Sequence, residues 1–259
     1  MGHVIAVINQ KGGVGKTTTA INLGAYLAKS GRSVLLVDMD PQGNATSGLD
    51  VNKQHLDGTM YEVLFGEIVA QQPVIRETSI EGLYILPANA RLAAAEIDLA
   101  QEEHREYKLK EALKNVNYDY VLIDCPPALG LLTINALTAA KQVLIPVQAE
   151  YYALEGLGQL LDVIQRVRGG LNAQLDILGV LVTMFDSRTS LAENVAEELK
   201  KHFGDKVLTT VIPRNVRLAE APSYGRSILE HDKWSKGARA YKQLAKEIDK
   251  RTGGNKNER

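Results

Sequence analysis

Cysteine is nearly absent from this sequence of 259 residues, which contains a single one, Cys125. One thiol cannot form a disulfide within the chain, and it cannot supply the set of thiolates that an iron–sulfur cluster or a structural zinc ion requires. Cysteine-based metal chemistry within one chain is therefore excluded. Cys125 lies inside an apolar run that is typical of a buried strand.

Long apolar segments are also missing. No uninterrupted apolar segment reaches the length of about 20 residues that a bilayer-spanning helix needs, and the N-terminus has no basic region followed by the apolar core of a signal peptide. The composition, 45% hydrophobic and 24% charged, is ordinary for a globular protein. We therefore expect a cytoplasmic protein, and its length fits one large α/β domain.

A strong excess of either charge is missing as well, because 30 Lys and Arg nearly balance 31 Asp and Glu. The total charge therefore does not make the protein an obligate nucleic-acid binder. The balance is uneven along the chain, since residues 225–259 contain ten Lys or Arg against five Asp or Glu. A local basic face can still form toward the C-terminal end.

A glycine-rich loop with two lysines follows the first apolar run of the chain. The run 4–8 is typical of a buried strand, and residues 19–28 have the apolar spacing of a helix. A strand, a glycine loop and a helix N-terminus in this order form a cradle in which backbone N–H groups and the helix dipole attract phosphate. The residues predicted to bind a nucleotide here are Lys11, Gly12, Gly13, Val14, Gly15, Lys16, Thr17 and Thr18.

This loop departs from the common P-loop pattern G-x-x-x-x-G-K-[ST] at its first position, where the chain has Gln10. It has instead a second lysine, Lys11, at its entrance, which makes it the deviant form of the Walker A motif. Lys16 adds a point charge to the cradle, and Thr17 offers a hydroxyl to Mg²⁺. A glycine-rich turn with incidental lysines is the alternative, and the flanking strand and helix argue against it.

Two aspartates follow the next apolar run. The run 33–38 ends in Asp38, and a carboxylate at the C-terminal end of a parallel strand faces the crevice where open α/β sheets bind ligands. Asp40 lies in the polar loop that follows and is well placed to reach the terminal phosphate of a nucleotide. From its local sequence alone, Asp40 could equally be a turn or capping residue before Pro41.

A further apolar strand ends in an acid. The run 118–124 ends at Asp124 and is followed by Pro126 and Pro127, which end the strand and stiffen the loop. This is the form of a Walker B strand, whose acid holds Mg²⁺ directly or through water. A core strand that ends in a turn aspartate is the alternative, and the presence of the P-loop argues against it.

The remaining patterns alternate between strands and helices along the chain. Strands are expected over 83–87, 142–147, 177–184 and 207–212, and helices over 60–64, 92–97, 107–116, 131–140, 153–168, 191–203 and 238–248. This alternation predicts an α/β fold, a doubly wound, mostly parallel sheet flanked by helices on both faces. We expect one P-loop ATPase domain over residues 1–251 and a flexible tail over 252–259.

Taken together, these motifs make the sequence resemble the ParA-type ATPases, and above all the Soj branch, which partitions bacterial chromosomes and plasmids. The resemblance rests on residues 11–17, 38–44 and 122–127 and continues through 146–156 and 211–223. It covers essentially the whole chain up to the tail. It implies a P-loop NTPase of the deviant Walker A type that hydrolyses ATP slowly with Mg²⁺. The slow hydrolysis of ATP then sets how long the protein stays dimeric.

The resemblance also implies roles for individual residues. ATP lies between the two subunits of a homodimer, and Lys11 reaches the partner's phosphates as an arginine finger does. Lys11, Lys16 and Asp40 are the implied catalytic residues, with Asp40 positioning the attacking water. The other implied site residues are Thr17, Asp38 and Asp124 for Mg²⁺, and Pro213 and Asn215 for the adenine base.

Nonspecific binding of double-stranded DNA by the ATP-dependent dimer is the second implied activity, which would place the protein at the nucleoid. Arg188 and Arg217 match the arginines that contact DNA in this family, and Arg214 and Lys236 extend the patch. A lone arginine is more often a solvated surface residue, so this prediction depends on the resemblance. Phosphate contacts of this kind carry no sequence preference and weaken with salt. The implied partner that stimulates hydrolysis is a ParB/Spo0J-type DNA-binding protein.

Three other protein classes share features of this loop. A MinD-like membrane-surface ATPase ends in an amphipathic membrane helix, but the stretch 238–248 has a thin apolar face and the tip lacks Trp, Phe and Leu, so we expect no stable membrane insertion. An iron–sulfur reductase subunit is excluded by the single cysteine. A nucleotide binder that does not hydrolyse ATP stays open if Asp40 is not catalytic.

Overall fold

The computed structural model describes residues 2–71, 73–150 and 155–253 and contains a seven-stranded sheet. The strands are β1 (His3–Val7), β2 (Val34–Asp38), β3 (Arg76–Glu77), β4 (Leu83–Leu86), β5 (Tyr120–Asp124), β6 (Gln142–Gln148) and β7 (Asp176–Thr183). Their order is β3-β4-β2-β5-β1-β6-β7, and every neighbouring pair is parallel except β3 with β4. The predicted mostly parallel sheet is confirmed, and the short antiparallel edge strand β3 is an addition to it.

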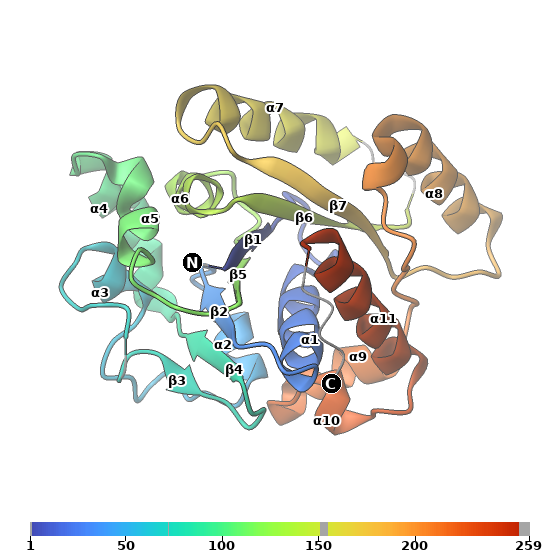
Figure 1. The fold of residues 1–259 in the computed structure, drawn as a ribbon, viewed down its shortest axis with the longest axis horizontal. Helices are drawn as coiled ribbons and strands as arrows, with labels where there is room; N and C mark the ends of the chain where they lie inside the picture. The colour runs from blue at the N-terminus through green and yellow to red at the C-terminus, as the bar shows by residue number, and fades with distance from the viewer. Residues whose placement is uncertain (1, 72, 151–154, 254–259) are drawn as a thin grey trace.

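Helices cover both faces of the sheet, as the doubly wound fold predicts (Figure 1). One face carries α1 (Lys16–Lys29), α2 (Asn44–Gly48), α9 (Val216–Glu220), α10 (Ile228–His231) and α11 (Lys236–Arg251). The other carries α3 (Met60–Leu64), α4 (Ala95–Asp98), α5 (Lys108–Ala112), α6 (Leu131–Ala139), α7 (Glu155–Gly170) and α8 (Ser190–Phe203). Residues 153 and 154 of the helix predicted over 153–168 lie outside the described residues, as do residues 254–259 of the predicted tail.

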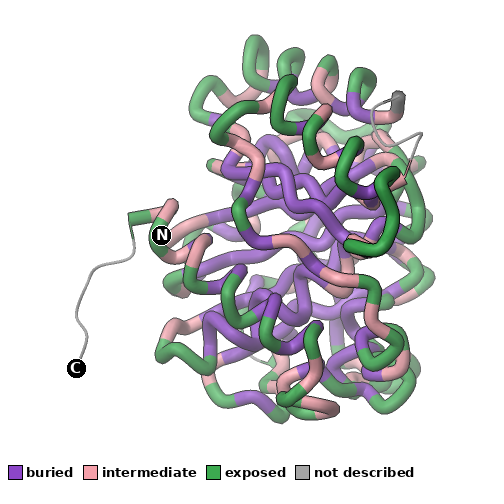
Figure 2. Tube along the Cα trace, turned by 90° about the vertical axis from the view of Figure 1, so that its right-hand side faces the viewer, coloured by how far each residue is buried: buried purple, intermediate pink, exposed green. Residues whose placement is uncertain are grey.

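Side chains alternate between two hydrophobic cores along each strand. In β1, Val4 and Ala6 belong to the core that includes α3 to α8, whereas Ile5 and Val7 belong to the core that includes α1 and α11. Both faces of the sheet are shielded from water, because helices cover a parallel sheet on both sides. Figure 2 shows this buried interior between more exposed outer helices. Polar groups that act on a ligand must therefore project from the strand ends.

The strand predicted over residues 207–212 is wrong. This segment runs along the edge of β7 but makes only one isolated bridge with it, between Val207 and Val180, and the next bridge joins Pro213 to Phe185. Glu247 of α11 accepts hydrogen bonds from the backbone N–H groups of Thr209 (2.8 Å) and Thr210 (2.9 Å). Because these donors are used by a side chain, they cannot extend a ladder beside β7.

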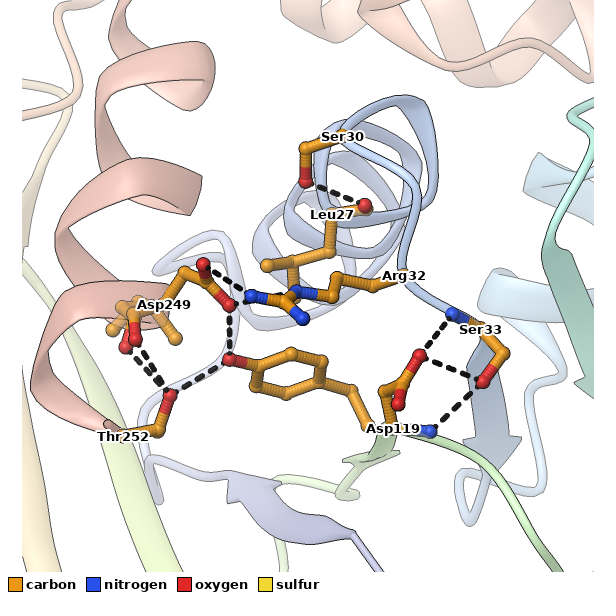
Figure 3. A network of polar contacts seen from close by, with 9 residues as sticks. Leu27, Ser30, Arg32, Ser33, Asp119, Asp249 and Thr252 are labelled. Carbon is orange, nitrogen blue, oxygen red and sulfur yellow. Dashed lines mark hydrogen bonds and ion pairs between the residues drawn. The ribbon is translucent and has the colours of Figure 1, made fainter. Parts of the chain in front are cut away.

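The last helix is fastened to the amino-terminal edge of the sheet by a polar network (Figure 3). Asp249 of α11 accepts hydrogen bonds from the Arg32 guanidinium (3.1 and 2.9 Å) and from the Tyr120 hydroxyl (2.7 Å). Burial acts to raise the pKa of Asp249, but the hydrogen bonds from Arg32 and Tyr120 outweigh it and lower that pKa. Tyr241 and Leu244, on the apolar face of α11, are buried in the core beside α1. The thin apolar face of this helix is therefore used inside the fold.

Candidate nucleotide-binding site

The glycine-rich loop connects β1 to α1 and faces open space. Gly13 and Gly15 have φ angles of 75° and 89°, in the left-handed region that favours glycine. A Cβ atom added to Gly12 or Gly13 would meet nothing within 4 Å. A cavity of about 660 Å³ lies there, and no side chain caps the N-terminus of α1. Because the first N–H groups of a helix lack partners within it, this cavity suits an anion such as phosphate.

Lys16 is the buried lysine of the loop. It is 7% exposed, and its Nζ donates a hydrogen bond to the backbone oxygen of Lys11 at 3.2 Å. Burial lowers the pKa of Lys16, while the nearby Asp124 acts to raise it. An anion in the cavity would stabilise the charged form of this ammonium group further.

Asp38 and Asp124 end two neighbouring strands and lie opposite each other in the register of β2 and β5. Both are completely buried. Asp38 accepts hydrogen bonds from the N–H (2.9 Å) and hydroxyl (2.7 Å) of Thr46 and from the N–H of Asp40 (3.2 Å). Burial raises the pKa of Asp38 to about 6 against these hydrogen bonds. Because both of its oxygens are already engaged, Asp38 holds the loop that follows β2 in place.

Asp124 differs because neither of its carboxylate oxygens has a hydrogen-bond partner among the described residues. Burial raises the pKa of Asp124, and the nearby charge of Asp38 raises it further. The Thr17 hydroxyl and the Lys16 ammonium group act to lower it. A buried carboxylate without partners is unfavourable, and a bound cation would compensate it. Its oxygens and the Thr17 hydroxyl are the hard oxygen donors that Mg²⁺ prefers.

Within the described ranges, no group of three or more His, Cys, Asp or Glu could hold a metal ion. Mg²⁺ usually binds through one or two carboxylates together with substrate phosphates, and it keeps several waters. Asp124 and Thr17 fit that mode, in which a nucleotide would supply further oxygens. The residues predicted for Mg²⁺ are thus brought together, with the hydrogen-bonded Asp38 beside Asp124.

Asp40 lines the same cavity as the loop residues. It is 8% exposed, and its Oδ1 accepts a hydrogen bond from the N–H of Gln42 at 2.9 Å. This is the turn role that the position before Pro41 allows. The other carboxylate oxygen makes no hydrogen bond to any described residue. Asp40 is therefore fixed by the turn and still has one oxygen for a second task.

A smaller, mainly apolar cavity of about 350 Å³ adjoins the phosphate cavity. The two share the lining residues Gly15, Thr18 and Met184. Both residues predicted for the adenine base, Pro213 and Asn215, line the smaller cavity. The side chain of Asn215 caps α9 by accepting a backbone N–H at 2.9 Å, which fixes its position. A polar cavity suits the phosphates of a nucleotide, and the adjoining apolar cavity with a fixed amide suits its base.

Lys11 has a different environment from Lys16. It does not line either cavity, and its Nζ lies 3.2 Å from Oε2 of Glu150, which follows β6. The Lys11 side chain is 42% exposed. An exposed ion pair of this kind contributes only about 0–1 kcal/mol. The Lys11 ammonium group can therefore exchange Glu150 for a more strongly charged anion.

The predicted DNA-binding arginines are exposed, and each lies near a carboxylate. Arg188, in the loop between β7 and α8, donates hydrogen bonds to both oxygens of Asp186 at 2.9 and 2.6 Å. The Arg188 guanidinium holds the pKa of Asp186 well below its usual range, and Arg214 adds to this effect. Arg214 also lies 3.9 Å from Glu150, the partner of Lys11. Arg188, Arg214 and Lys11 thus belong to one connected region of charge.

Arg217 and Lys236 lie in a second region, around α9 and the start of α11. Arg217 donates a hydrogen bond to Glu220 at 2.9 Å, and its Nε lies 3.8 Å from Oδ2 of Asp232 in the loop before α11. Lys236 is exposed at the first position of α11. Figure 1 shows this part of the molecule beside α1.

Several lining residues were not predicted from the sequence. Met184 follows β7, lines both cavities and has a φ angle of 51°, which is unusual for a residue with a side chain. Its position after a parallel strand is the same signal that indicated Asp38 and Asp124. The other residues of the phosphate cavity that the sequence did not indicate are Ile21, Gln42, Asn44, Ser47, Pro127, Pro222 and Ser223.

Comparisons with known proteins agree with this geometry. A family model described as an AAA domain matches residues 2–177. The chain is 57% identical over 250 residues to the sporulation initiation inhibitor protein Soj of Bacillus subtilis, which covers 96% of this chain and 98% of that protein. It is 51% identical over 250 residues to the chromosome partitioning protein ParA of Caulobacter vibrioides, with 95% and 93% of the two chains covered.

Among solved structures, cobyrinic acid a,c-diamide synthase from Mycobacterium smegmatis, with a bound ATP analog and magnesium, matches with a TM-score of 0.83. The two are 42% identical, and the match covers 95% of this chain and 93% of that chain. Its name describes a different activity, so the structural likeness supports the fold, and the full-length relatives support the family. With relatives above half identity along almost its entire length, the chain belongs to the ParA/Soj family of chromosome-partitioning ATPases.

Proposed function

We propose that this protein is a Mg²⁺-dependent ATPase whose ATP-bound homodimer holds double-stranded DNA and releases it after slow hydrolysis. The observation that carries the proposal is the buried Asp124, whose two unpartnered oxygens lie in the neighbourhood of Thr17 and Lys16 at the glycine loop. The adjoining apolar cavity with Asn215 supports an adenine nucleotide. The named activities of the relatives support DNA segregation as the setting.

The nucleotide is held by groups that the fold already positions. The N–H groups of the loop and Lys16 bind the phosphates, and Thr17 and Asp124 hold Mg²⁺. Mg²⁺, when bound, neutralises negative charge on the phosphate oxygens. Asp38 keeps the loop after β2 in register through its hydrogen bonds to Thr46.

Asp40 is the group proposed to orient the attacking water. Its Oδ1 is fixed by the N–H of Gln42, and its second oxygen can accept a hydrogen bond from a water molecule in the phosphate cavity. Positioning of this kind, without a dedicated strong base, fits slow turnover. ATP then sets the lifetime of an assembled state.

Lys11 is the residue proposed to connect two subunits. Its ammonium group is exposed, lies outside the chain's own cavities and is held only by the weak pair with Glu150. Developing negative charge on a partner's phosphates is a stronger attraction than an exposed carboxylate. Dimerisation would therefore depend on the bound nucleotide.

The DNA contacts proposed are Arg188, Arg214, Arg217 and Lys236, which the dimer presents twice. A ParB/Spo0J-type protein is the proposed activator, and a cytoplasmic, nucleoid-associated location follows from DNA binding. We also propose that residues 1–251 act as one domain. Doubling a small patch suits a chain whose formal net charge is −1.

A MinD-like membrane-surface ATPase is the second candidate. Its main requirement is a free amphipathic helix at the C-terminus, whereas the apolar residues of α11 are buried in the core. Of the helices in the described ranges, none is long and apolar enough to cross a membrane. The packing of α11 favours the DNA-segregating function.

The direct test is ATP turnover and DNA retention measured with the same preparation. We expect slow Mg²⁺-dependent turnover that a cognate ParB-type protein and DNA together accelerate. We also expect DNA retention with a non-hydrolysable ATP analog and none with ADP. Equal retention with ADP and the analog would contradict the proposal, and so would turnover that does not require Mg²⁺.

A further inference from the structure

Trp234 is the one tryptophan of the chain and the most exposed large hydrophobic side chain among the described residues, with 77% of its surface accessible. It lies in the loop between α10 and α11. An indole in this position contributes little to the packing of the chain. Tryptophan is enriched where one molecule contacts another, because it offers a large apolar face.

Hydrogen bonds fix the backbone of Trp234 in the loop. The backbone N–H of Trp234 donates a hydrogen bond to Oδ1 of Asp232 at 3.1 Å, and the Arg239 guanidinium donates one to the backbone oxygen of Trp234 at 3.2 Å. The next residue, Ser235, caps α11 by accepting the N–H of Ala238 at 3.1 Å. Trp234 is therefore exposed on an ordered loop rather than on a frayed segment.

Three cations lie close to Trp234 in the chain, and one of them contacts the indole. The Nζ of Lys233 lies 5.4 Å from the ring centroid of Trp234, which is a cation–π contact. Lys236 and Arg239 follow in the first turn of α11. Within the part of the chain that the structure describes, none of these three cations forms an ion pair. They differ in this respect from the arginines described above, each of which lies near a carboxylate.

We propose that Trp234 is a DNA-contact residue whose indole packs into a groove of the duplex, while Lys233, Lys236 and Arg239 pair with the flanking phosphates. Apolar side chains that enter the minor groove are a general device of proteins that bind DNA without reading its sequence. One cation over an exposed apolar ring, with two more cations in the next helical turn that form no ion pair among the described residues, complements a polyanion that has apolar sugars and bases in its grooves. The inference rests on the proposed DNA binding and adds to it a component that salt does not screen.

An anionic lipid surface would attract the same cations, but the apolar contact it needs is larger. Interfacial anchoring takes the whole apolar face of a helix. The apolar face of α11 is buried in the core, which leaves only the indole. The structure therefore favours DNA over a membrane at this surface.

The emission of Trp234 tests its own contact, since no other tryptophan is present. In protein loaded with Mg²⁺ and a non-hydrolysable ATP analog, titration with a short mixed-sequence duplex should quench or shift the emission. Trp234→Ala should weaken DNA binding about fivefold, the lower end for a base–aromatic contact, and Trp234→Phe should retain most of the affinity. Ile97→Ala, at a side chain on α4 that is 69% exposed, is the matched control and should bind DNA normally.

The salt dependence separates the two components of the contact. Trp234→Ala should leave the slope of log affinity against log salt unchanged, because it removes no phosphate contact. Lys236→Ala should reduce that slope by about one per subunit.

Three outcomes would overturn the inference in different ways. Unchanged emission, together with wild-type affinity of Trp234→Ala, would overturn it while leaving the proposed DNA binding intact. An emission shift with phosphatidylglycerol vesicles but not with DNA would assign the surface to lipid. Failure of the wild-type protein to retain DNA would remove both the inference and the DNA part of the proposed function.

Discussion

The carboxyl edge of the sheet and the outer basic surface use charge in opposite ways. At the edge, Asp38 and Asp124 are completely buried, and Lys16 is nearly so. On the surface, Arg188 and Arg217 are exposed and already paired with acids of the same chain. Neither buried oxygen of Asp124 has a hydrogen-bond partner among the described residues, which is unfavourable without a bound cation, so this group points to a ligand site. An exposed paired arginine is ordinary and gains meaning only when several act together.

This difference predicts two kinds of mutational effect. Changes in the buried pocket should abolish one step and leave the others intact, because each group there acts on a different part of the bound nucleotide. Changes on the surface should weaken DNA binding by small steps that depend on salt, because each cation adds a small contribution that salt screens.

Asp40→Ala should give the largest effect, a loss of turnover of about 10²-fold or more, because the attacking water loses the carboxylate that orients it. Nucleotide binding should survive, because the loop, Lys16 and Asp124 remain. Steady-state phosphate release measures the loss, and nucleotide binding by titration provides the control. Turnover at the wild-type rate would leave Asp40 with its turn role alone.

Asp124→Asn should weaken Mg²⁺-dependent nucleotide binding about 100-fold, the upper range for altered metal-site groups. The same change should stabilise the ligand-free protein at a pH above the raised pKa of Asp124, where it removes an unpartnered buried charge. Thermal unfolding with and without Mg²⁺ and nucleotide gives both readouts. A ligand-free variant less stable than wild type at that pH would show that Asp124 is not an uncompensated charge.

The pH dependence of the ligand-free protein follows from the raised pKa values of both acids, about 6 for Asp38. The folded chain holds these protons more tightly than the unfolded chain does. Their stabilising contribution is therefore fully present below the ordinary aspartate pKa, about 3.9, and is lost as the pH rises through the folded-state values. Unfolding temperatures should fall as the pH rises from about 4 to about 6, the range that Asp38 sets, and the fall should be smaller in Asp124→Asn.

Lys11→Ala should leave ATP bound to a monomer and weaken nucleotide-dependent dimerisation by about tenfold or more, the value of one charge-assisted hydrogen bond. Light scattering with ATP and Mg²⁺ measures the dimer. Lys114→Ala is a suitable control, because it removes another exposed lysine that pairs with an acid, Glu111 at 3.6 Å, outside both cavities. A full dimer in Lys11→Ala would refute the role of Lys11 between subunits.

Arg188→Glu combined with Arg217→Glu should have the smallest and most conditional effect. We expect DNA retention to fall about tenfold near physiological salt and the salt slope to fall by about two per subunit, with unchanged nucleotide affinity. Arg166→Glu, an exposed arginine on α7 outside the proposed patch, is the matched control. Mobility shifts equal to wild type at low salt would exclude this pair from the DNA surface.

The pocket could be predicted from the sequence because its chemistry lies in short contiguous segments. The glycine loop, Asp38 and Asp124 each follow an apolar strand, and the carboxyl ends of parallel strands meet at one edge. The strand expected over 207–212 failed because Glu247, far along the chain, takes its backbone donors. Neither the pairing of Lys11 with Glu150 nor the exposure of Trp234 is visible in local sequence, because both depend on tertiary packing.

The most direct test of the central claim is the mass of the DNA-bound species formed by Asp40→Ala, measured by sedimentation on a short duplex. We predict a dimer on DNA with ATP and Mg²⁺, and free monomer with ADP or without nucleotide. A monomer on DNA with ATP, or the same DNA-bound species with ADP, would contradict the claim that ATP closes the dimer that holds DNA.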